Sequence, residues 1–342
     1  MPRVVIELTN RCNLSCQHCF AGRHGGGDDL PLDVLQVVLD GAMDAGFDHL
    51  AFTGGDPTVH PAFPDAVKRA HDAGYRYSFV TNGWNFSSIY RLILPYREGL
   101  TGIAFSIDGA DEATHDALRG RHSFQRLLKS VSICVALGLP FTFNMVVSSQ
   151  NRHQLRQMAT LASGLRAGGL RFIHLMPTML SHAQGLDLSP SERKAVEAEI
   201  RQLQADCDLP VSMAAGFHTT DLFPCSPLNL QEVNVDCHGN LTTCCQISGH
   251  GPGTGQDDVI ASLAETSFGD AYAMLVEHNR AFREAKSERF ERGNVPDTDY
   301  FPCWFCSVQY GKVDWIRRLK GHEWAGHLRQ STPVVSISPS AP

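Results

Sequence analysis

Short apolar runs and amphipathic stretches alternate along the first half of the chain. Six runs carry the β-branched and aromatic residues typical of buried strands, and they cover residues 4–8, 49–53, 75–80, 102–106, 141–147 and 170–175. Between them, residues 63–73 and 124–137 place apolar residues at helical spacing. Strands that alternate with helices predict an α/β fold with a parallel sheet and right-handed crossovers. Functional residues are then expected at the carboxyl ends of the strands.

Glycine and polar residues stand where these apolar runs end. They are Gly54, Gly55, Asp56, Pro57, Thr81, Asn82, Ser106, Asp108 and Asn144. Parallel strands bring such positions to one mouth, although strand-to-loop turns use the same residue types without any ligand. Arg119 and Arg121 could bind a carboxylate bidentately, but we interpret both as solvated charges at the start of a helix.

Three cysteines follow the first apolar run directly. Cys12, Cys16 and Cys19 have the spacing C-x3-C-x2-C. Three thiolates can hold three irons of a [4Fe–4S] cube and leave the fourth iron open to a small ligand. A structural zinc site would need a fourth ligand, which His18 or His24 could supply. The cysteine triplet alone supports both sites equally.

A second cysteine set lies in the last third of the chain. Residues 233–244 are predicted to form a hairpin that turns at His238-Gly239, and the set consists of Cys225, Cys244, Cys303 and Cys306. Four thiolates can close one metal site, either a zinc ribbon or an iron–sulfur site. Cys245 would point away from Cys244 on a strand, so only one of the two is expected to face the metal, and the spacing from Gly239 favours Cys244.

The remaining thiols have no partner at metal-ligand spacing. Cys237 and Cys245 stay unassigned, and either could fill a buried apolar position. We assign Cys134, on a predicted apolar helix face, and Cys207 to packing. Eleven cysteines in a chain without a leading apolar segment indicate metal or redox chemistry in a reducing cytoplasm rather than disulfides.

The cysteine triplet and the Gly54-Gly55-Asp56-Pro57 motif together resemble the radical S-adenosylmethionine (SAM) enzymes. Two positions depart from the family pattern, because His18 stands where an aromatic residue is usual and Asp56 where Glu is usual. The resemblance implies a partial (β/α)6 TIM-like barrel with a [4Fe–4S] cluster on the triplet and SAM on its open iron. It also implies that His18 and the residues at the strand ends bind this cofactor. It also implies that SAM is cleaved to a 5′-deoxyadenosyl radical, which takes hydrogen from a C–H bond of the substrate.

The second cysteine set resembles the twitch domain of these enzymes, a shortened SPASM domain that binds one auxiliary [4Fe–4S] cluster. That resemblance implies an oxidation assisted by the auxiliary cluster, or an epimerisation in which Cys237 or Cys245 returns a hydrogen atom. It further implies an electron donor such as flavodoxin or ferredoxin. The expected organisation is a barrel over residues 1–205, a twitch-like unit over 206–322 and a tail over 323–342.

The start of the first strand and the net charge of the chain limit the classes of molecule that we expect it to bind. The first strand starts at Val4, which leaves no room for a leading peptide-binding domain and favours a small polar metabolite such as a sugar, aminocyclitol or nucleoside-like compound. Modification of a ribosomally made peptide remains the alternative, and a structural zinc protein is the rival from another class. The net charge of −7 argues against nucleic acid, and no apolar segment has transmembrane length. Residues 23–29 and 248–257 could be lids or plain surface loops, and residues 331–342 are expected to be disordered.

Overall fold

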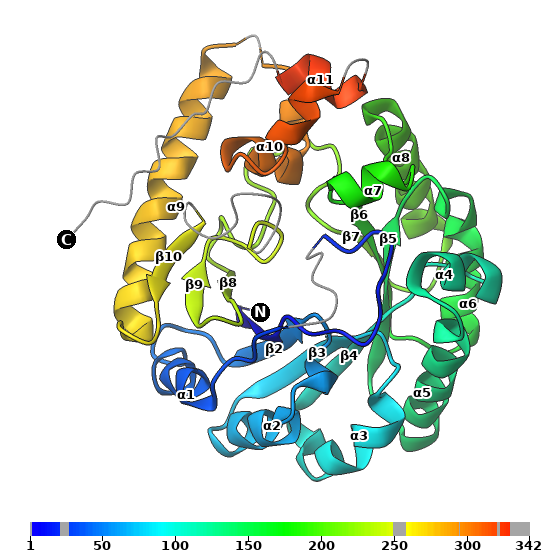
Figure 1. Cartoon of the computed structure of the whole chain (residues 1–342), viewed down its shortest axis with the longest axis vertical. Helices are drawn as coiled ribbons and strands as arrows, with labels where there is room; N and C mark the ends of the chain where they lie inside the picture. Colours follow the sequence, from blue (N-terminus) through cyan, green and yellow to red (C-terminus); the bar gives the residue numbers. More distant parts are fainter. Residues whose placement is uncertain (1, 21–26, 249–257, 294, 320–321, 329–342) are drawn as a thin grey trace.

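The computed structural model describes residues 2–20, 27–248, 258–293, 295–319 and 322–328. Figure 1 shows the strands arranged in an open ring, with α10 and α11 at its open side and most helices outside it. Several predictions fall outside the described residues, namely His24 as a zinc ligand, most of the loops 23–29 and 248–257, and the disordered tail 331–342.

One sheet contains the ten strands of the described chain, in the order β10-β9-β8-β1-β2-β3-β4-β5-β6-β7. Strands β8 and β1 to β7 run parallel, whereas β9 is antiparallel to both of its neighbours. The strands are β1 (Arg3–Thr9), β2 (His49–Gly54), β3 (Arg76–Thr81), β4 (Leu100–Ser106), β5 (Phe141–Val147), β6 (Leu170–His174), β7 (Val211–Met213), β8 (Glu232–Val235), β9 (Asn240–Thr242) and β10 (Val259–Ser262).

The predicted α/β class and partial (β/α)6 barrel are confirmed by this sheet. All six predicted runs are strands β1 to β6, and each pairs in parallel with the next. The predicted hairpin is also present, because β8 pairs with β9 and Gly239 adopts a φ of +84° in the turn between them. The returning strand is shorter than predicted and ends at Thr242.

Helices connect the strands and cover the outside of the ring (Figure 1). The α-helices are α1 (Leu32–Gly41), α2 (Phe63–Asp72), α3 (Phe86–Ile93), α4 (Glu112–Arg119), α5 (Ser123–Leu137), α6 (Leu155–Gly164), α7 (Met179–Ala183), α8 (Pro190–Asp206), α9 (Phe268–Glu291), α10 (Pro302–Gln309) and α11 (Glu323–Leu328). The 3-10 helices are η1 (Pro57–Val59), η2 (Leu94–Gly99), η3 (Arg152–Gln154), η4 (Asp297–Tyr300) and η5 (Asp314–Arg318).

Alternate strand residues separate the apolar core from a polar interior. The core between sheet and helices includes Val4, Ile6, Leu8, Phe52, Phe79, Phe105, Phe143, Val233 and Val235. Residues that alternate with these point into the ring, and they include Glu7, Thr53, Ser106, Asn144 and Asn234. On this inner face the Asn234 side-chain amide of β8 donates to a Glu7 carboxylate oxygen of the neighbouring β1 at 3.4 Å. The inside of the ring is therefore suited to a polar ligand.

The last third of the chain extends the same sheet. Strand β8 pairs with β1, and α9 packs on the barrel through Phe47, whose ring contacts Phe268 and Tyr272 at centroid distances of 6.2 and 5.3 Å. Figure 1 shows α10 and α11 between α9 on one side and α7 and α8 on the other. The division at residues 205 and 206 stays a prediction, and the sheet continues across it because β7 pairs with β6.

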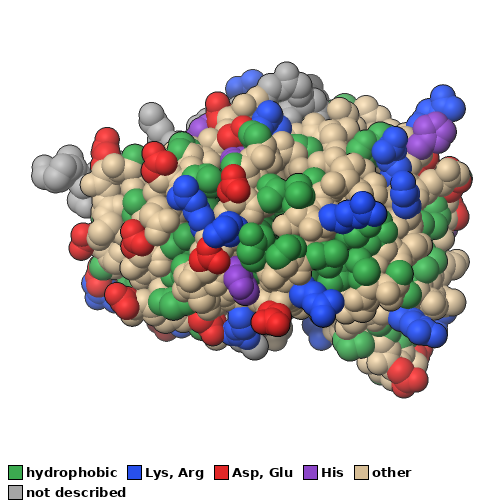
Figure 2. All heavy atoms as spheres, turned by 90° about the horizontal axis from the view of Figure 1, so that it is seen from below, with side chains coloured by type: hydrophobic (Ala, Val, Ile, Leu, Met, Phe, Trp, Pro, Cys, Tyr) green, Lys and Arg blue, Asp and Glu red, His purple; other side chains and the backbone are tan. Residues whose placement is uncertain are grey.

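The outer surface carries both signs of charge. Figure 2 shows acidic, basic and apolar side chains interspersed over the face that carries α2 and α3. Within the described residues, the helices are all too short or too polar to span a membrane.

Candidate functional site

The first three cysteines lie in a loop that leaves the carboxyl end of β1. The loop is fixed at its start, because the Asn10 backbone N–H donates to the Asp28 carbonyl and Arg11 pairs with Asp29. Further along, the Gln17 N–H donates to the Leu118 carbonyl at 2.9 Å, which ties the loop to the end of α4. The loop is thus held from two sides.

The thiols of this loop lie close enough to influence one another. Burial is the main cause that raises the pKa of Cys16 to about 12, and Cys12 and Cys19 raise it further. The pKa of Cys12 is also raised, again mainly by burial. Unliganded Cys12 and Cys16 would therefore stay protonated, and a bound metal centre would have to displace their protons. Cys19 lies close enough to act on both of them, and three converging thiols fit an iron–sulfur cluster held by three cysteines.

The glycine motif after β2 packs directly against the cysteine loop. The Gly55 N–H donates to the Thr9 carbonyl at 2.7 Å and the Asp56 N–H to the Arg11 carbonyl at 2.9 Å. A Cβ on Gly54 would lie 2.0 Å from the Thr9 carbonyl oxygen, and one on Gly55 would lie 2.1 Å from that of Arg11. Gly54 also has a φ of +137°. Glycine is required here so that two backbones can touch.

We expect Gly55→Ala to lower the iron bound per reconstituted chain and to lower the melting temperature, because the new methyl group would push the cysteine loop away from β2. Gly164→Ala is the matched control, since a Cβ at that helical position meets nothing within 4 Å. Iron analysis and thermal unfolding of both variants under anaerobic conditions measure the effect. Equal iron and equal melting temperatures for the two variants would contradict it.

Asp56 turns its side chain inward to β3. One carboxylate oxygen accepts from the Thr58 N–H at 3.0 Å and from the Thr58 hydroxyl at 2.5 Å. The other accepts from the Thr81 hydroxyl at 2.9 Å and from the Asn82 N–H at 2.8 Å. Asp56, Thr81 and Asn82 thus form one hydrogen-bonded unit beneath the glycine turn. The 3-10 helix η1 begins directly after Asp56, at Pro57. The cofactor-binding roles predicted for Asp56, Pro57, Thr81 and Asn82 stay predictions.

Asn82 connects this unit to the cysteine loop. Its side-chain amide donates to the Asn13 side chain at 2.8 Å and lies 3.6 Å from the Cys12 sulfur, while its side-chain oxygen accepts from the Trp84 N–H. An amide donor beside a metal-ligating sulfur stabilises the thiolate. These contacts confirm that the carboxyl ends of β2 and β3 lie beside the cysteine loop, as predicted.

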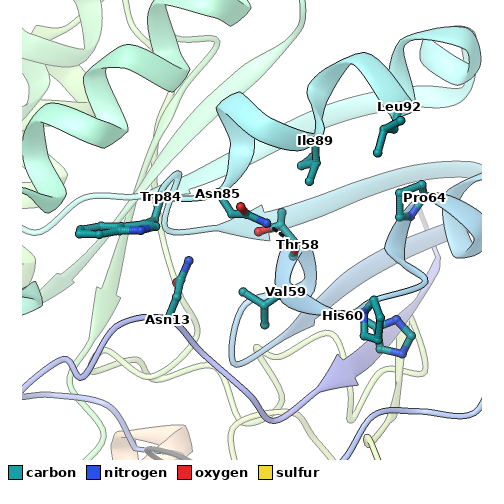
Figure 3. Close-up of a pocket in the computed structure, with 10 residues that line it drawn as sticks. Asn13, Thr58, Val59, His60, Pro64, Trp84, Asn85, Ile89 and Leu92 are labelled. Carbon is teal, nitrogen blue, oxygen red and sulfur yellow. Dashed lines mark hydrogen bonds between the residues drawn. The ribbon is translucent and has the colours of Figure 1, made fainter.

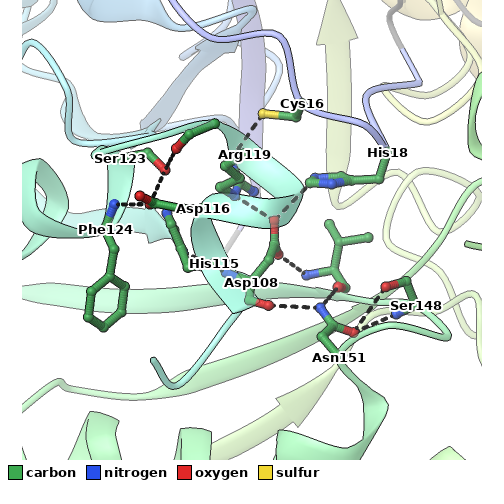
Figure 4. Close-up of polar contacts among 12 residues, drawn as sticks. Cys16, His18, Asp108, His115, Asp116, Arg119, Ser123, Phe124, Ser148 and Asn151 are labelled. Atoms are coloured by element: carbon green, nitrogen blue, oxygen red, sulfur yellow. Dashed lines mark hydrogen bonds and ion pairs between the residues drawn. The ribbon is translucent and has the colours of Figure 1, made fainter. Parts of the chain in front are cut away.

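A buried ion-pair network surrounds Asp108 at the end of β4 (Figure 4). One Asp108 carboxylate oxygen lies 2.5 Å from Nε of Arg119 and 3.2 Å from Nε2 of His18, and the other accepts from the Val146 N–H at 2.8 Å. Asn151 donates to the Asp108 carbonyl at 3.0 Å. With no exposed surface, this carboxylate connects β4, β5, α4 and the cysteine loop.

Arg119 corrects an expectation. The sequence predicts a solvated charge at a helix start, but Arg119 is the last residue of α4 and only 8% exposed. Its guanidinium bridges Asp108 and the sulfur of Cys16, with Nη1 3.9 Å from Sγ. The physical reason is that α4 ends against the cysteine loop, where the carboxylate compensates the buried charge. Arg121 is exposed, as expected.

The charges of this network follow from burial and pairing. Burial alone would raise the pKa of Asp108, but Arg119, His18 and His115 outweigh it and the pKa is lowered. Burial lowers the pKa of His18 to about 4, so its imidazole is neutral at pH 7. Asp108 is therefore a carboxylate, paired with one cationic guanidinium and one neutral imidazole. The arrangement places a positive charge beside the Cys16 sulfur.

Two other buried histidines make stability sensitive to acid. Burial is the main cause that lowers the pKa of His115 to about 4 and that of His174 to about 3, from an ordinary value of 6.5. Below pH 6.5 the unfolded chain takes up these protons and the folded chain does not, so stability falls as the pH falls.

We expect the free energy of unfolding to drop by up to about 1.4 kcal/mol per pH unit for each of these histidines between pH 6.5 and about 4. Urea unfolding of the reconstituted protein at several pH values measures the slope. His115→Gln should reduce it, whereas the same change at the exposed His122 should not. A slope unaffected by His115→Gln would contradict this account.

Ser106 and Asn144 lie next to each other on the inner face of the barrel. They are register partners on β4 and β5, and both are half-buried. The Asn144 carbonyl accepts from the Ile107 N–H at 2.8 Å, which leads the chain from β4 to Asp108. The structure thus brings the predicted strand-end residues of β4 and β5 together, and their contact with a cofactor stays a prediction.

A pocket of about 540 Å³ adjoins the cysteine loop (Figure 3). Its lining comes mainly from η1 and the segment after it, from the end of the loop that follows β3, and from α3. Asn13 is the lining residue that belongs to the cysteine loop, and Asn85 donates to the Thr58 carbonyl across one wall at 2.8 Å. The inner-face residues Ser106 and Asn144 are not among its lining residues.

The second cysteine set also converges. The pKa of Cys306 is raised to about 12, mainly by burial and then by Cys225. Burial raises the pKa of Cys303 as well, and Cys306, Cys225 and Cys245 add to it. The hydrogen bond with Cys245 is the largest cause that raises the pKa of Cys244, followed by burial and the charge of Cys303. Residues far apart in sequence therefore supply one group of thiols, which fits a metal centre with thiolate ligands.

Cys244 and Cys245 do not alternate on a strand, in contrast to the sequence prediction. β9 ends at Thr242, and a turn begins at Cys244, whose carbonyl accepts from the N–H groups of Ile247 and Ser248. Both thiols can consequently reach the same group. Cys245 also lies 3.9 Å from Glu232, at the first residue of β8, whereas Cys237 follows the carboxyl end of that strand and is buried. The choice of ligand and the hydrogen-donor roles stay predictions.

Sequence reasoning missed Lys286, a buried cation beside the second cysteine set. Its side chain is 2% exposed, donates to the Leu222 carbonyl at 2.8 Å and lies over the Phe305 ring at 4.7 Å. Burial lowers its pKa, while Cys306 and Cys225 raise it. A cation there would balance the negative charge of thiolates. The sequence signal that could have revealed it is a lysine among the apolar positions of a long helix.

As expected, Cys134 is buried in the core and Cys207 packs against it.

Comparisons with known proteins agree with this arrangement. Residues 6–162 match the Radical SAM superfamily. The AdoMet-dependent heme synthase of Methanosarcina barkeri is 27% identical over 222 residues, which are 64% of this chain and 63% of that protein. Mycofactocin maturase MftC of Mycobacterium tuberculosis is 30% identical over 196 residues, 56% of this chain and 49% of that protein. The chain thus spans less than two thirds of these relatives.

A solved structure supports the barrel fold. The structure described as native anSMEcpe with bound AdoMet superposes with a TM-score of 0.63 over 93% of this chain and 100% of that chain, at 14% identity. At that identity the likeness concerns the fold alone.

Proposed function

We propose that this chain reductively cleaves SAM and abstracts hydrogen from a substrate, because residues 6–162 match the Radical SAM superfamily, which uses a [4Fe–4S] cluster and SAM. Cys12, Cys16 and Cys19 would hold the cluster. The observation that carries the proposal is the convergence of these thiols, of which Cys16 is buried and the other two are half-buried, beside the Gly54-Gly55 turn and the Arg119 guanidinium. When bound, the reduced cluster supplies one electron that cleaves SAM into methionine and a 5′-deoxyadenosyl radical.

The residues of the chain position and insulate this chemistry. Arg119 places a cation beside the Cys16 sulfur, and Asp108 holds Arg119 and His18 in place. Asp56 ties the glycine turn to β3 through Thr81 and Asn82. We propose that Asp108 and Asp56 act as positioning residues for the SAM site, since each carboxylate is already engaged by protein donors.

We propose that SAM lies along the inner face of the strand ends. The backbone of Gly54 and Gly55 would receive its amine, with Ser106 and Asn144 closer to its sugar and base. Support comes from the half-buried position of Ser106 and Asn144 next to each other on β4 and β5.

A second [4Fe–4S] cluster is proposed for Cys225, Cys244, Cys303 and Cys306, in a twitch-like unit that follows the barrel. Its support is the mutual proximity of these thiols and the buried Lys286, which would offset the negative charge of four thiolates. Cys245 competes with Cys244 for the ligand position, because both thiols reach the group. A flavodoxin or ferredoxin would supply the electrons.

Two substrate classes are supported by different observations. The polar interior lined by Glu7, Thr53, Ser106, Asn144 and Asn234 favours a small polar metabolite that is oxidised or epimerised. The 29% identity over 170 residues to the PqqA peptide cyclase of Bradyrhizobium diazoefficiens favours modification of a ribosomally made peptide. In an epimerisation, Cys237 is the stronger candidate hydrogen donor, because it follows the carboxyl end of β8 while Cys245 lies at the other end of that strand.

Anaerobically reconstituted protein tests the proposal. With dithionite and SAM we expect equal amounts of 5′-deoxyadenosine and methionine, and neither product without dithionite. Absence of reductive cleavage from protein that contains iron and sulfide would contradict the proposal. Zinc without iron after anaerobic purification would support a structural zinc protein instead.

A further inference from the structure

Two histidines and an aspartate converge where α7 and the segment after it meet the start of α11. Nδ1 of His182 lies 2.9 Å and Nε2 of His322 lies 3.7 Å from the same carboxylate oxygen of Asp187. The two imidazole rings are 5.0 Å apart between centroids. From this cluster we infer that His182, Asp187 and His322 bind one divalent transition metal ion, with zinc as the expected occupant.

The spacing of the donor atoms suits a single ion. All three atoms lie within 4.8 Å of one another. Bonds of about 2.0–2.1 Å at a tetrahedral ion place two ligand atoms roughly 3.3 Å apart. The distances of 2.9 and 3.7 Å to Asp187 lie on either side of that value. A small adjustment of the side chains would therefore admit zinc in place of the present hydrogen bond.

The aspartate is already oriented by its neighbours. The Ser181 hydroxyl lies 3.1 Å from the second carboxylate oxygen of Asp187, and Ser181 itself is locked in a capping box with Thr178 at the start of α7. A hydrogen bond to the non-ligating oxygen is the kind of support that fixes metal-binding carboxylates. The first oxygen then faces the two imidazoles.

The cluster is closed to solvent on the side of His322 and open on the side of His182, which suits a metal site with a free position. The His322 side chain is 10% exposed, that of Asp187 18% and that of His182 40%. Within the described residues, Nδ1 of His322 is buried without a hydrogen-bond partner. Two nitrogens and one oxygen suit zinc or a similar borderline ion, and the exposed side leaves a fourth position for water or a substrate group.

The cluster connects two elements that are distant in sequence. His182 lies in α7, which follows β6, and His322 directly precedes α11. Trp324 of α11 also joins these two parts of the chain. Its indole N–H donates to the Leu188 carbonyl at 2.9 Å, and the Arg193 guanidinium lies over its ring at 4.6 Å. A bound ion would fasten α11 to the rim where the strands end. This inference does not depend on the proposed function.

The inference is tested by measuring whether protein with reconstituted iron–sulfur clusters retains zinc. Reconstituted protein receives one equivalent of zinc chloride, is desalted, and is analysed for zinc and iron, with zinc X-ray absorption to identify the ligands. We expect about one zinc per chain with nitrogen and oxygen neighbours near 2.0 Å and no sulfur shell near 2.3 Å. His182→Gln and His322→Gln should each lose this zinc and keep their iron.

The matched control is His218→Gln, because His218 forms a similar pair with Asp297 at 3.3 Å but has no second histidine at that carboxylate among the described contacts. It should retain zinc as the wild type does. The inference would be overturned if the wild type bound no zinc or if its zinc had sulfur ligands. It would also be overturned if His182→Gln and His322→Gln both retained zinc. The ligand shell of the wild type decides the matter even where a variant folds poorly. Retained iron and SAM cleavage without zinc would refute this site and leave the proposed function intact.

Discussion

Asp108→Asn is expected to lower the free energy of unfolding by about 3–5 kcal/mol, because it leaves the buried charge of Arg119 without its partner. Asp108 has no exposed surface and the Arg119 side chain is 9% exposed, so water cannot take over the lost interaction. The same change would weaken the hold on His18 and reduce the iron retained at the cysteine loop. Anaerobic urea unfolding and iron analysis of the reconstituted variant measure both effects.

An exposed ion pair provides the control. Asp48 and Arg76 lie 2.7 Å apart, with side chains 58% and 36% exposed, so Asp48→Asn should cost no more than about 1 kcal/mol. In the double variant Asp108→Asn/Arg119→Gln we expect a cost smaller than the sum of the single changes, because no unpaired charge remains. Similar costs for Asp108→Asn and Asp48→Asn, or additivity in the double variant, would show that the network is not a coupled unit.

The double change Cys303→Ala/Cys306→Ala should lower the iron content from about eight to about four per chain, since four thiolates are needed to close one [4Fe–4S] site. Reductive SAM cleavage should persist, because the thiols of the cysteine loop belong to a different group. Cleavage of SAM without turnover of substrate would then assign the second cluster to the later steps.

Two further variants sharpen this prediction. Cys207→Ala removes a thiol that only packs against the core and should leave the iron content unchanged. Cys244→Ala and Cys245→Ala, made separately, distinguish the ligand from its neighbour by which one loses iron. If Cys303→Ala/Cys306→Ala keeps about eight irons, the proposed auxiliary cluster is wrong.

The barrel could be predicted from sequence because its signal is local and repeated. Each strand from β1 to β6 is a short apolar run, and the helical stretches between them have a different period. The position of the cysteine loop beside Gly54-Gly55 follows from the same pattern, because parallel strands bring their carboxyl ends to one edge. The backbone contacts at Thr9 and Arg11 then explain why glycine stands there.

Long-range burial of charge could not be predicted in the same way. Arg119 looks like a surface residue until α4 is seen to end on the cysteine loop, where Asp108 and Cys16 receive the guanidinium. Lys286 is buried for a comparable reason, next to thiols that come from distant segments. The end of β9 at Thr242 was also missed, because it is fixed by the Thr243 N–H bond to the Asp258 carbonyl and by the turn at Cys244.

The most direct test of the account is iron and sulfide content together with dithionite-dependent 5′-deoxyadenosine formation, measured on wild type, Cys12→Ala/Cys16→Ala/Cys19→Ala and Cys134→Ala. Cys134 lies in the apolar core, so its variant controls for the loss of a thiol. We predict about eight irons for wild type and control and about four for the triple variant, with 5′-deoxyadenosine absent only from the triple variant. Unchanged iron or continued SAM cleavage in the triple variant would contradict the central claim that this cysteine loop holds the catalytic cluster.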